Sequence, residues 1–263
     1  MSWILAVETS TEWCSVALGH ASPAGGLRCL ARHEQTGPRS SGRVLPAAGE
    51  LLAEAGIRLA DCAAIAFGAG PGSFTGLRTA CGIAQGLAFG ADLPVVPVNT
   101  LMACAERVRG VPGAALEGDA TAEPLPAGMP VLVALDARMD EVYTGLFGWD
   151  AARGEWHQAG PMGVVPPEAV QAPSATFWLA GNGVTVHGER LHAAAQAART
   201  IPGAMPHAAA VVALAQRALT RGETVAAADA APLYLRDKVA QTVAERQAAA
   251  AGRASLAATG ERQ

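Results

Sequence analysis

Residues 68–78 read Gly-Ala-Gly-Pro-Gly-Ser-Phe-Thr-Gly-Leu-Arg and join a short apolar run, Ala64 to Phe67, to a longer apolar segment, Thr79 to Phe89. A short apolar run that ends in glycines is typical of a buried strand, and a longer one that stops at a glycine is typical of a helix. The stretch therefore predicts a strand, a tight loop and a helix. Because it carries no catalytic side chain, we interpret the loop as a docking element.

The loop before this helix has two further interpretations. Backbone N–H groups at a helix N-terminus attract anions. A P-loop, however, requires a lysine and a hydroxyl residue directly after its last glycine, whereas Gly76 is followed by Leu77 and Arg78. The simpler interpretation is a capped turn, in which Ser73 or Thr75 accepts hydrogen bonds from the first helical N–H groups.

The predicted helix carries glycines at regular spacing. Gly82, Gly86 and Gly90 recur every four residues, so they share one face, which Arg78 and Thr79 extend toward the N-terminus. Each interior glycine costs about 1 kcal/mol of helix propensity relative to alanine. Close packing against a second helix would offset this cost. A second helix of the same chain is the simpler expectation, and a helix of another chain is the alternative.

Composition limits the class of protein. The chain has 263 residues, of which 51% are hydrophobic and 16% charged, enough for one large domain or two lobes. No apolar run could cross a bilayer and no signal peptide is recognisable, which predicts a cytoplasmic protein. Five scattered cysteines without a CxxC pair predict buried thiols rather than disulfides or zinc ligands. A net charge of −4 without a basic run argues against unaided nucleic-acid binding.

Two hairpins of the same kind open the two halves of the chain. Ile4 to Leu18 predicts a strand, a polar turn and a second strand, and the same pattern returns over residues 131–147. The first strand of each hairpin ends in an acidic residue, Glu8 or Asp136. This repetition predicts a duplicated α/β fold with a cleft between two lobes.

The other expected elements follow from apolar patterning and turn residues. The strands are expected at 26–34, 64–67, 94–98, 155–160 and 176–180, and the helices at 43–55, 76–90, from 99 or 100 onward, 184–197 and 208–221. Residues 110–128 are rich in Gly, Pro and Ala and predict a linker.

These elements divide the chain into three parts. Residues 1–104 form the expected first lobe, which the helix near 208–221 joins, and residues 105–207 form the second lobe. Residues 222–263 form a C-terminal segment. Its Ala-, Arg- and Gln-rich composition beyond about residue 240 predicts a flexible tail.

The repeated hairpin and two longer motifs resemble one bacterial family. Residues 4–18, the run GPGSFTGLR at 70–78, the run LDARMDEVY at 135–143 and, more weakly, residues 231–239 are similar to the TsaB (YeaZ) proteins. The resemblance covers most of residues 1–240. It implies a duplicated two-lobe fold of the actin-like, sugar-kinase-like and ribonuclease H-like kind. It also implies a non-catalytic partner of the TsaD-type subunit, which transfers a threonylcarbamoyl group to adenosine in tRNA.

The resemblance further implies where partners bind. The TsaD-type partner would contact helices of the first lobe, and a TsaE-type ATPase would bind the pair. The tRNA would bind only to the complex and not to this chain alone. A homodimer through the same helix is a further expectation. For Arg78 the sequence supports two interpretations equally: a solvated or internally paired side chain, or a side chain at the interface. The expected interface residues are Arg43, Leu45, Phe74, Thr75, Gly76, Arg78, Thr79, Gly82 and Gly86.

An independent phosphotransferase or ATPase is the alternative function. Its nucleotide-binding residues would be Thr9, Ser10, Thr11 and Asp136, because hydroxyl turns hold phosphate and a carboxylate holds a metal. The same residues are also ordinary hairpin formers. Where the family usually has aspartate this chain has Glu8, whose longer side chain shifts any carboxylate aimed at a metal. We expect no intrinsic cofactor, with ATP and a divalent metal confined to the complex.

Two other kinds of site find no support in the sequence. A histidine often stands in the family where this chain has Ser40, and residues 40–46 contain none. His187 and His192 are five apart and would lie on different faces of a helix, so no metal site is expected. Proteolysis is the least supported function, because no serine or cysteine has a local motif that places it beside a histidine base.

Overall fold

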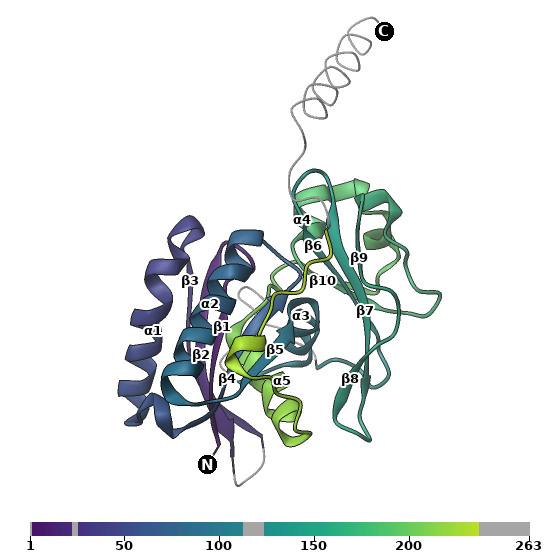
Figure 1. Cartoon of the computed structure of the whole chain (residues 1–263). Coiled ribbons are helices and arrows are strands. Elements are labelled where there is room, and N and C mark those ends of the chain that lie inside the picture. The colour runs from purple at the N-terminus through teal and green to yellow at the C-terminus, as the bar shows by residue number, and fades with distance from the viewer. Residues whose placement is uncertain (1, 23–25, 113–123, 237–263) are drawn as a thin grey trace, which may run out of the picture.

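The computed structural model describes residues 2–22, 26–112 and 124–236. Figure 1 shows two sheets side by side, each covered by helices. The first sheet contains β1 (Trp3–Glu8), β2 (Trp13–Ala21), β3 (Leu27–Gln35), β4 (Cys62–Gly70) and β5 (Val95–Asn99) in the order β3-β2-β1-β4-β5. The strands β1, β2 and β3 are antiparallel, and β4 and β5 run parallel to β1.

The second sheet repeats this arrangement. It contains β6 (Val131–Asp136), β7 (Val142–Asp150), β8 (Glu155–Gln158), β10 (Trp178–Ala180) and β11 (Arg199–Ile201) in the order β11-β10-β6-β7-β8, and β9 (Gly163–Val165) pairs with β7. Again three antiparallel strands are followed by two parallel ones. The expected duplicated, ribonuclease H-like α/β fold is therefore confirmed.

Helices pack on both faces of the first sheet (Figure 1). The α-helices of the described residues are α1 (Ser40–Ala55), α2 (Phe74–Ala91), α3 (Thr100–Arg109), α4 (Gly183–His187), which contacts β6 of the second sheet, and α5 (Ala208–Thr220). α1 and α2 cover the outer face, whereas α5 packs on β1, β2, β4 and β5, and α3 lies between the two sheets. We call the first sheet with α1, α2 and α5 the first lobe, and the second sheet with its helices the second lobe.

The alternation of side chains along the strands explains this layering. In β1, Leu5 and Val7 point into the core under α1 and α2, whereas Ile4 and Ala6 point into the central core with α3 and α5. In β6, Val131 and Val133 face this central core. Successive strand residues point to opposite faces of a sheet, so the unbroken apolar runs of β1 and β6 indicate strands covered on both faces.

Helix caps agree with the sequence at two positions. The Ser73 hydroxyl accepts a hydrogen bond from the Gly76 N–H at 3.5 Å, so the capped turn is confirmed. The Asn99 side chain accepts one from the Met102 N–H at 3.0 Å and begins α3 where expected. The helix α1 starts at Ser40, three residues before the expected position.

The second lobe contains the main error of the sequence analysis. The expected helix at 184–197 is wrong, because α4 ends at His187 and two short 3-10 helices, Gly188–Arg190 and His192–Gln196, follow. Gly188 has a φ of 54°, which a continuing α-helix cannot accommodate. The sequence also missed β9 and β11. The expected linker lies partly, and the tail beyond residue 240 wholly, outside the described residues.

A buried cluster around Glu106 of α3 connects the two lobes. Glu106 is fully buried, and its carboxylate accepts hydrogen bonds from Arg109 at 2.8 Å, from Arg217 of α5 at 2.7 Å and from the Trp156 indole of β8 at 2.6 Å. The guanidinium of Arg109 also lies 4.1 Å from the ring centroid of Trp149. We call these five residues the Glu106 cluster. Burial alone would raise the pKa of Glu106, but the arginine hydrogen bonds hold it below its ordinary value.

None of the helices in the described part of the chain is long and apolar enough to span a membrane.

Candidate functional sites: an open helical face and an interlobe pocket

The glycine stripe of α2 faces away from the rest of the chain. A Cβ atom placed on Gly82, Gly86 or Gly90 would meet no described atom within 4 Å. On α1 the same holds for Gly42 and Gly49. Packing against a second helix of this chain, the simpler expectation from sequence, is therefore wrong for the described residues. Two neighbouring helices instead leave backbone accessible to another molecule.

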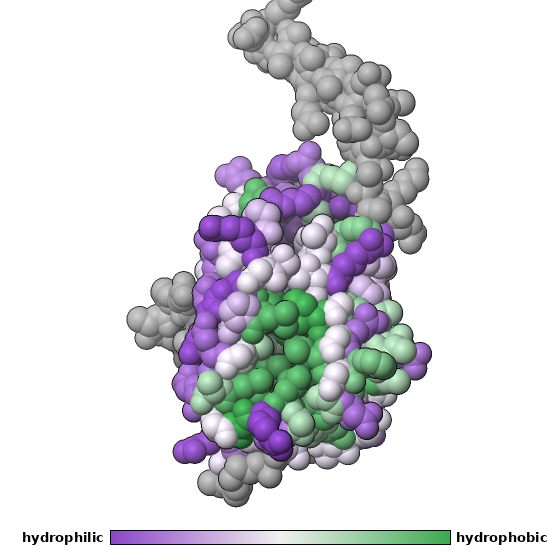
Figure 2. Space-filling model, turned by 60° about the vertical axis from the view of Figure 1, so that its left-hand side comes forward, coloured by the Kyte–Doolittle hydropathy of each residue, from purple (hydrophilic) through white to green (hydrophobic). Residues whose placement is uncertain are grey.

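Apolar side chains accompany these glycines. Phe89 of α2 is 84% exposed and Leu45 of α1 is 52% exposed. Leu52, Ile83 and Leu87 are partly buried at the edge of the core between the two helices. Figure 2, which brings the α1 side of the molecule forward, shows a continuous apolar patch bordered by hydrophilic residues. Large exposed apolar patches on soluble proteins mark interaction sites. We call this surface, with the two glycine stripes, the α1/α2 face.

The other expected interface residues divide into two groups. Arg43 pairs with Glu34 and Glu50, each at 2.7 Å, and Gly76 packs against the backbone oxygen of Thr9, where a Cβ atom would collide. These contacts lie within the first lobe. Phe74, Thr75, Arg78 and Thr79 lie at the N-terminal end of α2, and Arg78 lies 3.9 Å over the Phe74 ring.

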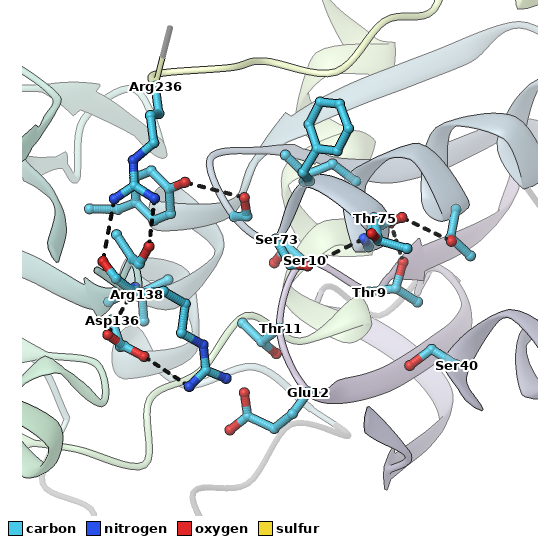
Figure 3. Close-up of a pocket in the computed structure, with 18 of the residues that line it drawn as sticks. Thr9, Ser10, Thr11, Glu12, Ser40, Ser73, Thr75, Asp136, Arg138 and Arg236 are labelled. Atoms are coloured by element: carbon cyan, nitrogen blue, oxygen red, sulfur yellow. Dashed lines mark hydrogen bonds and ion pairs between the residues drawn. The ribbon is translucent and has the colours of Figure 1, made fainter. Parts of the chain in front are cut away.

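A pocket of about 590 Å³ lies between the two lobes. The first lobe contributes the turn after β1 and the loop before α2, and the second lobe contributes the turn after β6. Figure 3 shows Thr9, Ser10, Thr11 and Glu12 on one side and Asp136 and Arg138 on the other. The Tyr143 hydroxyl donates a hydrogen bond across the pocket to the Gly72 oxygen at 3.3 Å. The structure thus gathers the four residues expected to bind a nucleotide.

Hydrogen bonds within the first lobe already engage its part of the pocket. The Thr9 hydroxyl donates to the Gly76 backbone oxygen at 2.8 Å. The backbone carbonyl oxygen of Ser10 accepts from the Ser73 N–H at 2.7 Å. The Thr11 hydroxyl accepts from the Trp13 N–H at 3.3 Å. These contacts fix the turn after β1 against the start of α2.

Asp136 is similarly engaged within the second lobe. One of its carboxylate oxygens lies 3.4 Å from the His187 imidazole and accepts a hydrogen bond from the Arg138 N–H at 3.0 Å. The other lies 3.4 Å from the Arg138 guanidinium. The Asp136 N–H donates to the Asn182 side chain at 2.9 Å. The sequence analysis missed His187 and Asn182 as neighbours of Asp136, because they come from a segment about 50 residues downstream in the chain.

Glu8 points away from the pocket into the central part of the first lobe. It is 2% exposed, and one carboxylate oxygen accepts a hydrogen bond from the Ser10 N–H at 2.5 Å. The other oxygen occupies the space beside Gly68, where any Cβ atom would collide with it. Burial, only partly offset by hydrogen bonds from Ser10, raises the pKa of Glu8 from 4.5 to about 7. In this position the carboxyl does not face a ligand in the pocket.

Glu8→Gln is expected to flatten the pH dependence of stability. The raised folded-state pKa means that the protonated Glu8 carboxyl is favoured in the folded chain. Its contribution to the free energy of unfolding is complete below pH 4.5 and is lost as the pH rises through about 7. This shift corresponds to about 3 kcal/mol. Urea unfolding between pH 5 and pH 8 should show the native chain losing stability relative to Glu8→Gln by an amount of this order. Parallel pH profiles for the two proteins would contradict the assignment.

The Ser40 hydroxyl is held by a hydrogen bond, and three cysteine thiols have raised pKa values. Ser40 is buried, and its hydroxyl donates to the Gly37 oxygen at 2.9 Å at the start of α1. Burial raises the pKa of the thiols of Cys14 and Cys62 to about 11 and that of Cys29 to about 12. Thiols with a raised pKa are poor nucleophiles. Within the described residues, no three His, Cys, Asp or Glu side chains gather in a way that could hold a metal ion.

Two lobes built on repeated sheets around a cleft define a protein of the actin-like, sugar-kinase-like class of α/β folds. A family model described as TsaD, tRNA N6-adenosine threonylcarbamoyltransferase, matches residues 34–244. The protein named tRNA threonylcarbamoyladenosine biosynthesis protein TsaB from Escherichia coli K12 is 37% identical over 241 residues, which cover 90% of this chain and 96% of that protein. The protein of the same name from Haemophilus influenzae is 35% identical, over 90% and 94% of the two chains.

A solved structure agrees with these relatives. YeaZ from Pseudomonas aeruginosa is 40% identical and superposes with a TM-score of 0.76, covering 89% of this chain and all of that one. The chain belongs to the TsaB (YeaZ) family. The resemblance inferred from its hairpin, its glycine-rich loop and the run at 135–143 is thereby confirmed.

Proposed function

We propose that this protein takes part in the formation of threonylcarbamoyladenosine in tRNA as the non-catalytic partner of a TsaD-type transferase. The relatives' name and the TsaD family model support the pathway. The α1/α2 face supports the partner role, and it is the observation that carries the proposal. Interface cores are apolar, and exposed glycines allow two helix backbones to approach closely.

The partner of this face is a TsaD-type paralogue. The two chains share a family model, so the paralogue is expected to offer similar helices, which would pack across the glycine stripes. Phe74 and Arg78 extend the contact, since aromatic residues and arginine dominate the energy of interfaces. A TsaE-type ATPase then engages the pair in the cytoplasm, and the tRNA meets the complex, where ATP and a divalent metal are bound. In the absence of the paralogue, the same face supports a homodimer.

One assay tests the partner role directly. The purified chain and its TsaD-type paralogue are assayed for tRNA threonylcarbamoylation separately and together, with the TsaE-type protein, ATP and Mg²⁺ present throughout. Activity only in the mixture is the expected result. Full activity of the paralogue without this chain, or the absence of any complex, would refute the proposal.

The second candidate function is nucleotide-dependent phosphotransfer in the interlobe pocket. The residues Thr9, Ser10, Thr11 and Asp136 line that pocket, and their chemistry favours this function. The inward position of Glu8 and the engagement of Asp136 by His187 and Arg138 argue against it. Magnesium-dependent ATP turnover by the isolated chain, abolished by Asp136→Ala, would establish it.

A further inference from the structure

The chain returns from α5 to the second lobe along the mouth of the interlobe pocket. Leu233, Tyr234, Leu235 and Arg236 all line this pocket. In Figure 1 this segment passes from the first lobe to the second, and Figure 3 shows Arg236 entering the second-lobe wall from it. We call residues 233–236 the strap. The partner role proposed above assigns nothing to these four residues, although it uses Phe74 and Arg78, which Tyr234 contacts.

The strap is tied to the first lobe at the glycine-rich loop. The Leu233 N–H donates a hydrogen bond to the Ala69 oxygen at 2.7 Å. The Leu233 oxygen passes so close to Gly70 that any Cβ atom there would collide with it, and Gly70 has a φ of 129°, where side chains are disfavoured. The requirement for glycine at this position of the 68–78 stretch therefore comes from the strap as well as from the turn.

Tyr234 adds a second contact with the first lobe. Its hydroxyl accepts a hydrogen bond from the Arg78 guanidinium at 3.1 Å, and its ring lies 5.3 Å from the ring of Phe74. The Tyr234 residue is nevertheless 41% exposed. The strap thus rests on the N-terminal end of α2 through contacts that water can reach.

Arg236 ties the strap to the second lobe. Its guanidinium donates to the oxygens of Ala137 at 3.0 Å and Arg138 at 3.4 Å and pairs with the Glu141 carboxylate. All these acceptors belong to the turn between β6 and β7. In this turn Arg138, Met139 and Asp140 have φ values of 60°, 58° and 58°. Three successive non-glycine residues in the left-handed region are unfavourable, and Arg236 bonds to the backbone of the turn that contains them.

The Glu106 cluster and the strap, two of the connections between the lobes, differ in character. The Glu106 carboxylate is fully buried, and its second-lobe partner is the Trp156 indole, so opening here would take a hydrogen bond away from a buried charge. In the strap, Tyr234 is 41% exposed and the paired side chains of Arg236 and Glu141 are 14% and 33% exposed, so these contacts cost less to open than contacts to a fully buried carboxylate. The strap is therefore the less deeply buried of these two connections, and it lies at the pocket.

From this contrast we infer that the strap is a releasable closure of the interlobe pocket. When Leu233, Tyr234 and Arg236 keep their contacts, the two walls of the pocket are held together and its mouth is covered. Release of the strap removes the support of the β6–β7 turn and exposes the pocket to small molecules.

A thiol placed inside the pocket tests this closure without knowledge of any ligand. Thr11→Cys introduces a reporter in the pocket wall, and its rate of reaction with a bulky maleimide is measured after subtraction of the rate for the chain without it. Adding Arg236→Ala is expected to raise this rate at least tenfold. Tyr234→Ala, which removes an exposed side chain, should raise it in the same direction. Arg236→Lys retains the charge and should give an intermediate rate.

Arg153→Ala is the matched control. Arg153 is an exposed second-lobe arginine paired with Asp150 at 3.7 Å, in the turn between β7 and β8, and its removal should leave the labelling rate unchanged. The maleimide reaction also requires only that each variant be folded, which circular dichroism verifies. Equal labelling rates in the Arg236→Ala, Tyr234→Ala and unmodified straps would overturn the inference.

Discussion

Gly86→Leu is expected to weaken binding of the TsaD-type paralogue about 100-fold, or about 3 kcal/mol, while the isolated chain unfolds at an unchanged or slightly higher temperature. Gly86 lies in the middle of the open stripe, and a Cβ atom there meets nothing within 4 Å in the chain. Leucine is also a better helix former than glycine by about 0.8 kcal/mol. The side chain would hold the partner's helix away without disturbing the lobe.

Thr220→Leu is the control for this substitution. Thr220 is exposed at the end of α5, away from the α1/α2 face, so the change adds a similar side chain to another helix. Calorimetric titration and thermal unfolding of both variants separate the two effects. If Gly86→Leu lowered the free energy of unfolding by as much as it lowered the free energy of binding, the stripe would pack inside the chain.

Glu106→Ala is expected to destabilise the chain by about 3–5 kcal/mol, because it leaves the arginines and the indole of the cluster without their shared acceptor. For a chain of this size such a loss lowers the unfolding temperature by about 10 °C or more. Glu106→Gln should fall between the native chain and Glu106→Ala, since an amide still accepts from the Trp156 indole but loses the charge. Differential scanning calorimetry provides the measurement.

A neighbouring exposed pair provides the comparison. Glu155 of β8 pairs with Arg221 at 2.8 Å, with about a third of each side chain exposed. Glu155→Ala removes the same type of side chain and should cost less than about 1 kcal/mol. If the two substitutions had equal effects, the Glu106 cluster would not connect the lobes in the way its burial indicates.

Most of the fold could be predicted from local patterning. The hairpins at 4–18 and 131–147, the strand before the glycine-rich loop and the helix at 208–221 are long or strongly apolar, and each appears where expected. The error at 184–197 has a local cause, because Gly188 ends α4 after five residues. The strands β9 and β11 have three residues each. Strands this short carry too little patterning to be recognised.

The candidate sites were predictable only in part. The glycine spacing identified the stripe, but only the packed structure could show that it faces outward. The resemblance implied Arg43 and Gly76 at the interface, and the structure adds the contacts that both make within the first lobe. Apart from Glu106 and Arg109, which are three positions apart, the Glu106 cluster and the strap join residues that are 50 to 111 and 95 to 164 positions apart in the chain. Pairings at such separations leave no periodic signal in the sequence.

The return of α5 to the first sheet affects how the chain folds while it is being synthesised. The Ala208 N–H donates a hydrogen bond to the Ser15 hydroxyl at 2.9 Å, a contact between residues 193 positions apart. At typical elongation rates, about 10–40 s pass between the synthesis of these two residues. During that time the ribosome-bound nascent chain has no helix α5 to cover one face of its first sheet. We therefore expect early folding to depend on chaperones that shield this face until synthesis is nearly complete.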